Sequence, residues 1–282
     1  PRAYLVWNID DHWQVKGGIS RAFKAPDMQL MTDGVVGLRG QGTIPMLGNP
    51  NLKPERSTSA ELGFSYTNLD NFSMNATAFY TDFKDKIDSL YLPNCDYTTS
   101  PNQSGCLTAS GSWDDIAEFS KRFNVDGAKL YGLELGSKYQ VNEAIGLSAN
   151  YTYTHSSYKQ DDGRKVPFSK TPQHMVNLKA DWTINSQWRA WAEGEYRARE
   201  YRGIDAKTDG KIYYRNYALV NIGASYKPSR DATINFGIDN LFDKNVIDYT
   251  APKTSQKGNG YQNNYARIEE GRKLWLKLNY EF

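Results

Sequence analysis

The sequence predicts an all-β protein, the C-terminal portion of an antiparallel transmembrane β-barrel, and three observations support this prediction. Apolar residues recur at every second position in segment after segment, which is the period of a β-strand with one apolar face. Short turns alternate with long polar loops, as they do when all hairpin turns of an up-and-down barrel lie at one rim. The opposite faces of the strands carry many charged residues, which a wet lumen accepts and a dry core does not.

The composition fits a barrel and excludes a helical membrane protein. The 282 residues include 20 Tyr, 11 Phe and 7 Trp. No stretch approaches the roughly 18 to 20 consecutive apolar residues that a membrane helix needs. A polar average is compatible with membrane strands, because their lipid-facing and water-facing residues alternate. The formal net charge of +2 is too small to indicate a nucleic-acid partner.

The first half of the chain contains six predicted strands. They are residues 3–7, 13–20, 60–66, 72–80, 131–139 and 145–153. Alternating apolar positions define them, such as Leu62, Phe64 and Tyr66 in the third strand. Tight turns at 9–12, 68–71 and 142–143 join the pairs, and the long connections fall at about 24–56 and 92–118. Helical signal is confined to residues 113–121, expected as one turn inside a loop.

The second half continues the same pattern with strands at 176–184, 188–198, 218–226, 232–238 and 273–282. The pattern is clearest where Val176, Leu178 and Ala180 alternate with polar residues. Turns at 185–187 and 228–231 are short, whereas the connections at 160–172, around Gly210 and at 246–270 are long. The final strand has Trp275 as the one apolar residue on its polar side. Tyr and Trp flank the apolar faces, as expected of interfacial aromatic girdles. A soluble β-sandwich or fibre domain is the alternative.

The odd strand count predicts an incomplete barrel. Bacterial single-chain barrels have even strand numbers, whereas the pattern here predicts about eleven strands. The first strand runs towards a short turn, so a long loop is expected before it. We therefore interpret residues 1–282 as a single domain, the C-terminal part of a larger barrel. The opening in mid-pattern at Pro1 indicates a missing start rather than a cytosolic protein.

The two cysteines, Cys95 and Cys106, lie in a polar, turn-rich segment. Two cysteines that close a loop predict a disulfide in an oxidising compartment. Two free thiols remain an alternative. Metal ligation is disfavoured because no His lies nearby.

Enzymatic motifs are absent from the sequence. His12, His155 and His174 are scattered, and no Ser or Cys is placed to form a nucleophile and base pair with them. There is no phosphate loop, HExxH motif or metal-finger spacing. Residues 161–163 read DDG and are expected to form a turn, with a cation site as the alternative. An outer-membrane lipase-like barrel is a further alternative, but it lacks an identifiable Ser/His pair.

Five segments in order resemble TonB-dependent outer-membrane receptors over nearly the whole chain. They are residues 15–26 (VKGGISRAFKAP), 48–57 (GNPNLKPERS), 130–134 (LYGLE), 239–244 (DNLFDK) and the terminal Phe282. Within that family, residues 37–42 (GLRGQG) followed by 47–50 (LGNP) resemble the colicin I receptor group, which takes up iron bound to catecholate siderophores. We expect the 48–57 segment itself to be scaffolding, because its prolines stiffen the loop and Gly48 permits a turn.

The resemblance implies a complete barrel of about twenty-two strands, an N-terminal plug and a box that engages TonB, neither of which lies in these residues. It implies an outer-membrane location with extracellular long loops, a periplasmic C-terminus and Phe282 as an assembly signal. The implied partners are a ferric siderophore, the TonB complex, membrane lipid and a bacteriocin or phage. No cofactor is expected, because iron travels with the siderophore. Alternatives are uptake of haem, cobalamin or another metallophore, and a passive porin-like or adhesive barrel.

A ferric catecholate is a bulky aromatic anion, so its site requires Arg or Lys for charge and Tyr, Trp or Gln for stacking and hydrogen bonds. Such residues must lie in the long loops or on the lumen face near them. The candidates are Arg39, Gln41, Tyr97, Arg197, Arg199, Tyr213, Arg215 and Tyr261. For each, the alternative is a solvated surface residue or a lumen ion pair with Glu193 or Glu195.

Overall fold

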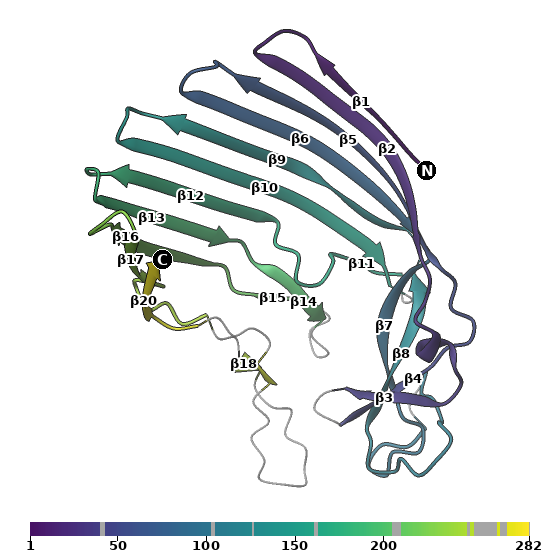
Figure 1. The fold of residues 1–282 in the computed structure, drawn as a ribbon. Helices are drawn as coiled ribbons and strands as arrows, with labels where there is room; N and C mark the ends of the chain where they lie inside the picture. Colours follow the sequence, from purple (N-terminus) through teal and green to yellow (C-terminus); the bar gives the residue numbers. More distant parts are fainter. Residues whose placement is uncertain are drawn as a thin grey trace.

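One curved antiparallel sheet dominates the structure, a computed structural model, and its strands follow one another in chain order (Figure 1). The structure describes residues 1–39, 43–102, 105–125, 127–160, 163–204, 210–246, 249–250, 264–265 and 270–281. The sheet contains β1 (Arg2–Asn8), β2 (Trp13–Lys24), β5 (Glu55–Thr67), β6 (Phe72–Lys84), β9 (Ala128–Gln140), β10 (Ile145–Lys159), β12 (His174–Thr183), β13 (Trp188–Arg197), β16 (Tyr217–Tyr226), β17 (Ala232–Asp239) and β20 (Lys273–Tyr280). Every predicted strand is present, which confirms the predicted all-β barrel architecture.

The long connections carry structure of their own. β3 (Val35–Arg39), β4 (Ile44–Leu47), β8 (Glu118–Val125) and β7 (Lys86–Pro93) form a second sheet, called the loop sheet below. The remaining elements are η1 (Met28–Met31), β11 (Lys165–Val166), the pair β14 (Glu200–Ile204) and β15 (Lys211–Tyr214), and the pair β18 (Tyr249–Thr250) and β19 (Asn264–Tyr265). The prediction of a helical turn at 113–121 is wrong. Residues 113–116 form a single hydrogen-bonded turn, and β8 begins at Glu118. In the described ranges no helix is long and apolar enough to cross a membrane.

Short turns and long connections lie at opposite rims, as predicted. The turns between β1 and β2, β5 and β6, β9 and β10, and β12 and β13 lie along one rim, whereas the connections that hold the loop sheet leave from the other (Figure 1). Asn and Asp side chains close these turns; Asp10, for example, accepts hydrogen bonds from the backbone of His12 and Trp13.

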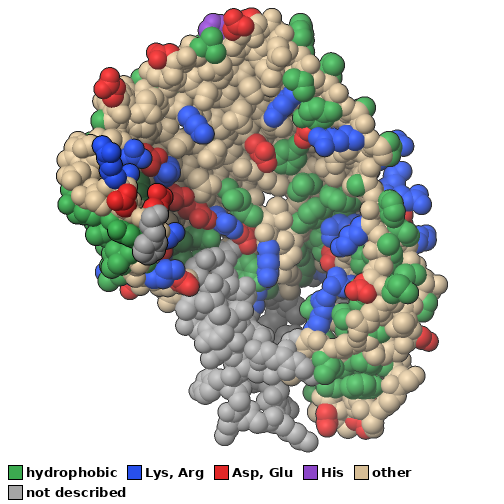
Figure 2. Space-filling model, viewed as in Figure 1, with side chains coloured by type: hydrophobic (Ala, Val, Ile, Leu, Met, Phe, Trp, Pro, Cys, Tyr) green, Lys and Arg blue, Asp and Glu red, His purple; other side chains and the backbone are tan. Residues whose placement is uncertain are grey.

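The apolar face of the main sheet is exposed rather than covered by a second layer. Large apolar side chains remain open on it, including Leu62 at 48%, Leu178 at 54% and Leu276 at 66% exposure. A water-soluble protein rarely exposes such a continuous apolar surface, whereas a barrel presents it to lipid. The opposite, hollow face carries charged residues along its strands (Figure 2). This distribution contradicts the β-sandwich alternative.

Aromatic side chains form a girdle at the short-turn rim of the apolar face. Trp13 lies 4.7 Å from Tyr66, Tyr66 6.2 Å from Phe72, and Phe72 6.3 Å from Tyr139, as distances between ring centroids. Interfacial positions favour such amphipathic rings, so the girdle marks one membrane boundary.

Two tryptophans on the polar face lie over glycines. Trp191, Gly223, Gly237 and Trp275 occupy one row across four paired strands. A Cβ added at Gly223 or Gly237 would come within 2.6 Å of the neighbouring indole, and the two indoles stack at 6.5 Å. The missing glycine side chains therefore explain how Trp275 fits on a polar face.

Candidate ligand-binding site

The loop sheet stands at the long-loop rim on a small core of its own. Phe119 and Pro45 are fully buried, and Leu47 is also buried. A pairing of β4 with β8 joins the first long connection to the second. Residues distant in the sequence are thereby fixed next to one another at the mouth of the hollow, around which Lys and Arg side chains gather (Figure 2).

The GNPNLKPE segment holds this sheet in place. The side chain of Asn49 donates to the backbone oxygen of Arg122 at 2.9 Å, and the Asn124 side chain accepts from the Lys53 N–H and donates to its carbonyl, both at 2.8 Å. Leu52 is buried, and a Cβ on Gly48 would lie 1.8 Å from the carbonyl oxygen of Thr32. The expected scaffolding role of this segment is confirmed.

Arg39 and Arg122 lie close together on the loop sheet. The Nη1 atom of Arg39 donates to Oγ of Ser89 at 3.2 Å, and Ser89 pairs in register with Arg122. The buried Nε of Arg122 has no hydrogen-bond partner among the described residues. Burial lowers the pKa of Arg122, and the positive charge of Arg39 lowers it further. Two neighbouring guanidinium groups favour an anion beside them.

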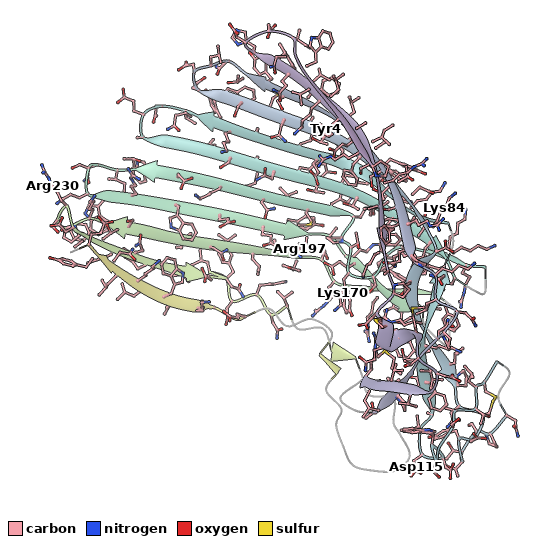
Figure 3. All side chains as sticks on the ribbon, turned by 45° about the vertical axis from the view of Figure 1, so that its right-hand side comes forward. Tyr4, Lys84, Asp115, Lys170, Arg197 and Arg230 are labelled. Carbon is pink, nitrogen blue, oxygen red and sulfur yellow. A yellow bond between two sulfur atoms is a disulfide. The ribbon has the colours of Figure 1, made fainter. Side chains whose placement is uncertain are left out.

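Arg197, by contrast, has its charge balanced. Its Nε donates to Oε1 of Glu195, which lies two residues earlier on the same face of β13. Figure 3 shows Arg197 near the long-loop end of that strand. The structure thus matches the alternative expected for this residue, a lumen ion pair.

Two of the predicted site residues, Arg199 between β13 and β14 and Tyr213 of β15, lie side by side. The Arg199 guanidinium lies 4.7 Å from the centre of the Tyr213 ring, which also meets Tyr201 edge-on at 5.9 Å. An aromatic anion requires a positive charge and an aromatic ring in its binding site, and Arg199 and Tyr213 provide both. Here, however, the two side chains form a cation–π contact with each other. Arg215 is exposed just after β15.

Tyr97 lies apart from these residues, in the loop closed by the Cys95–Cys106 disulfide. The disulfide is formed, so the free-thiol and metal-ligand alternatives do not hold. Asn94 anchors the loop by donating to the carbonyls of Trp113 and Ile116, both at 2.9 Å. The backbone of Thr98 bonds to Asp114, next to Asp115 at the far tip of the loop sheet in Figure 3.

Three candidates, Gln41, Tyr261 and Phe282, lie outside the described residues, as do Asp161 and Asp162 of the DDG turn. Sequence reasoning missed Arg122, because no strand was predicted between residues 92 and 130. The alternation of Phe119, Lys121 and Phe123 with Ser120 and Arg122 is the signal that could have found it.

The histidines make structural contacts. His12 Nδ1 donates to the Thr67 carbonyl at 2.8 Å, His155 stacks on Tyr131 at 4.8 Å, and His174 shares a 2.9 Å hydrogen bond with the Tyr151 hydroxyl. Within the described part of the chain no group of three His, Cys, Asp or Glu is placed to hold a metal ion.

Comparison with known proteins decides the family. The sequence model described as "TonB dependent receptor-like, beta-barrel" matches residues 1–241. The chain belongs to the TonB-dependent receptors. An iron-regulated outer membrane virulence protein of Vibrio cholerae is 33% identical over 282 residues, which are 100% of this chain and 39% of that protein. The ferric enterobactin receptor of Pseudomonas aeruginosa is 28% identical over 260 residues, 88% of this chain and 33% of the receptor.

Solved structures agree with this TonB-dependent receptor barrel. A crystal structure of a variant of the Pseudomonas aeruginosa ferric enterobactin receptor matches with a TM-score of 0.70 and 25% identity, over 100% of this chain and 40% of the receptor. The chain therefore spans about two fifths of the length of these relatives. They are named as receptors and membrane proteins, which agrees with the expectation of a non-enzymatic function. That residues 1–282 form one C-terminal domain remains a prediction.

Proposed function

We propose that this chain is part of an outer-membrane receptor that imports ferric siderophores, with catecholate siderophores as the preferred class. The observation that carries the proposal is the pair of Arg39 and Arg122 on the loop sheet, two guanidinium groups close enough for the charge of one to lower the pKa of the other. A ferric catecholate presents negatively charged oxygens around an aromatic shell, and guanidinium groups bind such oxygens through charge-assisted hydrogen bonds.

The relatives support the choice of Arg39. Solved structures of the Pseudomonas aeruginosa receptor include variants in which an arginine and a glutamine two positions further on are replaced by alanine, and some contain enterobactin. This chain has Arg39 and Gln41 at the same spacing. Their side chains provide the charge and the hydrogen-bonding amide that the ligand requires.

The arrangement in the membrane follows from the same proposal. The long loops face the medium, where they meet the siderophore and any bacteriocin or phage, and the short turns and C-terminus face the periplasm. Transport is driven by the TonB complex through an N-terminal plug. The protein needs no resident cofactor, because iron enters as part of its ligand.

A binding experiment with the full-length, detergent-purified receptor tests this function. Tryptophan fluorescence is titrated with a ferric catecholate, and the iron-free siderophore, haem and cobalamin serve as controls. Saturable quenching by the iron complex alone is the expected result. Quenching by haem or cobalamin without any response to the ferric catecholate would replace the substrate class, and no response to any of them would favour the porin-like or adhesive alternative.

A further inference from the structure

Cations are concentrated on the outward face of the main sheet, where β2, β5, β6, β9 and β10 approach the long-loop rim. The pairing of these strands is continuous and without bulges, so residues two apart share a face. Continuing the outward phase of Ile19, Leu62, Tyr80, Tyr131 and Tyr153 leads to a set called the basic band: Arg21, Arg56, Lys84, Lys129 and Lys159.

Register brings the basic band together. Arg56 lies directly opposite Lys84, an unfavourable pairing of like charges unless an anion lies nearby. The next row of paired residues runs Arg21, Thr58, Asp82 and Lys129 across four strands. Asp82 is the one acidic residue in this row and in the row of Arg56 and Lys84. All five side chains of the basic band are exposed, and none of them forms an ion pair with an acidic residue in the described part of the chain.

The basic band borders the lipid-facing surface. Ile19 is 59% exposed and Tyr80 41% exposed, and Arg21 and Lys84 follow them on the same strands. Arg21 lies two residues beyond Ile19 and Lys84 four beyond Tyr80, so at about 3.3 Å per residue these charges stand roughly 7 to 13 Å further out, at the depth of lipid headgroups. Phe23, 76% exposed on the same face, lies opposite Arg56 and adds one apolar side chain among the cations. Figure 3 shows Lys84 on the outer side of the sheet at this rim.

The basic band lies at one rim, on five neighbouring strands. The outward phase of Leu274 on β20 also leads to a cation, Arg272, but Asp243 lies 3.9 Å from it and balances its charge. At the long-loop end of β12 and β13 the outward residues are His174, Val176 and Tyr196. At the short-turn end of β2, β5 and β9 they are the aromatic residues Trp13, Tyr66 and Tyr139. General anchoring of a barrel in its membrane would place such cations all around the rim, so the concentration of cations without an ion pair on five neighbouring strands indicates a specific partner.

We propose that the basic band binds phosphate groups of anionic lipid headgroups in the membrane leaflet at the long-loop rim. Arg21 and Arg56 supply guanidinium groups that match phosphate oxygens, and the lysines add point charges on flexible stems. The lipid's acyl chains pack on the apolar rows beneath. This site depends on the membrane-barrel assignment and not on the identity of the siderophore.

The test compares two triple variants of the full-length receptor by native mass spectrometry in detergent. One removes cations of the basic band, Arg56→Gln, Lys84→Gln and Lys129→Gln. The matched control removes the same charges from the inner face, Arg189→Gln, Lys138→Gln and Lys277→Gln. The probes are diphosphorylated lipid A, its dephosphorylated form and phosphatidylcholine. Heat-modifiable migration on gels confirms that each variant is folded before lipid is added.

The wild type and the inner-face control should retain diphosphorylated lipid A, and the band variant should bind it at least about tenfold more weakly. Dephosphorylated lipid A and phosphatidylcholine should not distinguish the three proteins. Equal retention by the band variant, or equal loss in the inner-face control, would overturn the proposal. A wild-type dimer that disappears in the band variant would overturn it in favour of a protein contact.

Discussion

Gly223 illustrates how single residues set the shape of the inner face. Its missing side chain leaves room for the Trp191 indole, and a Cβ there would also lie 2.8 Å from the Phe236 carbonyl oxygen. Gly223→Ala should therefore destabilise the folded barrel by about 1–3 kcal/mol, the usual cost of overpacking. The midpoint of urea-induced unfolding in lipid vesicles measures this.

Gly194 on the neighbouring strand provides the control, because a Cβ there meets nothing within 4 Å. Gly194→Ala should leave the midpoint unchanged. Equal effects of the two substitutions would show that the packing of the tryptophans over glycine is unimportant.

Asn124 is the residue through which the GNPNLKPE segment positions Arg122. Its side chain bonds to both backbone groups of Lys53 and donates to the Asp85 carbonyl at 2.7 Å. Asn124→Ala leaves these groups unpaired, at a local cost of about 1–3 kcal/mol. We expect faster hydrogen exchange of the β8 amides and weaker siderophore binding. Asn216→Ala, in an exposed segment, should change neither; unaltered exchange in β8 would contradict the positioning role.

At the scale of single residues, the sequence indicated which residues are candidates for the site better than it indicated which residues they contact. Arg199 and Tyr213 were both candidates for the ligand site, and they lie side by side. Arg122 was missed because its position depends on Asn49, which is 73 residues away. Arg197 was proposed for the ligand, yet Glu195 balances its charge.

Among the elements, the tip of the loop sheet is stabilised by one covalent bond. The Cys95–Cys106 disulfide spans 11 residues, and closing a loop of this size contributes about 3 kcal/mol. The double substitution Cys95→Ser and Cys106→Ser should accelerate proteolytic cleavage between residues 95 and 117. The melting temperature of the barrel should stay the same, because both cysteines lie outside the main sheet. A loss of barrel stability, or unchanged protection of the tip, would contradict this assignment.

The sequence pattern located the membrane-spanning part of each strand correctly, but it ended several strands too early at the long-loop rim. Residues 60–66 were predicted where β5 covers Glu55–Thr67, and 72–80 where β6 covers Phe72–Lys84. The apolar alternation stops where lipid contact stops, and Arg56 and Lys84 then occupy the outward positions. β7 and β8 escaped prediction because their pairing is long-range and their burial follows neither barrel face.

At the scale of the whole molecule, the apolar face must be lipid-facing. Leu178 is 54% exposed on that face, and its neighbour Asn177 points to the lumen side of the same strand. Leu178→Lys should destabilise the full-length receptor in lipid vesicles by about 2–4 kcal/mol, the cost of a cation near the bilayer midplane. Asn177→Lys, in contrast, should be tolerated. Similar folding yields for both variants on heat-modifiability gels would remove the lipid-facing assignment.

We propose that the loop sheet of this TonB-dependent receptor holds a ferric catecholate through Arg39 and Arg122. The most direct measurement is the dissociation constant of that complex for the full-length wild type, Arg39→Ala, Arg122→Gln and Ser89→Ala. We predict that each arginine variant binds about tenfold or more weakly, the loss of a charge-assisted hydrogen bond, whereas Ser89→Ala, which keeps both charges, binds nearly as the wild type does. Wild-type affinity in both arginine variants would contradict the account.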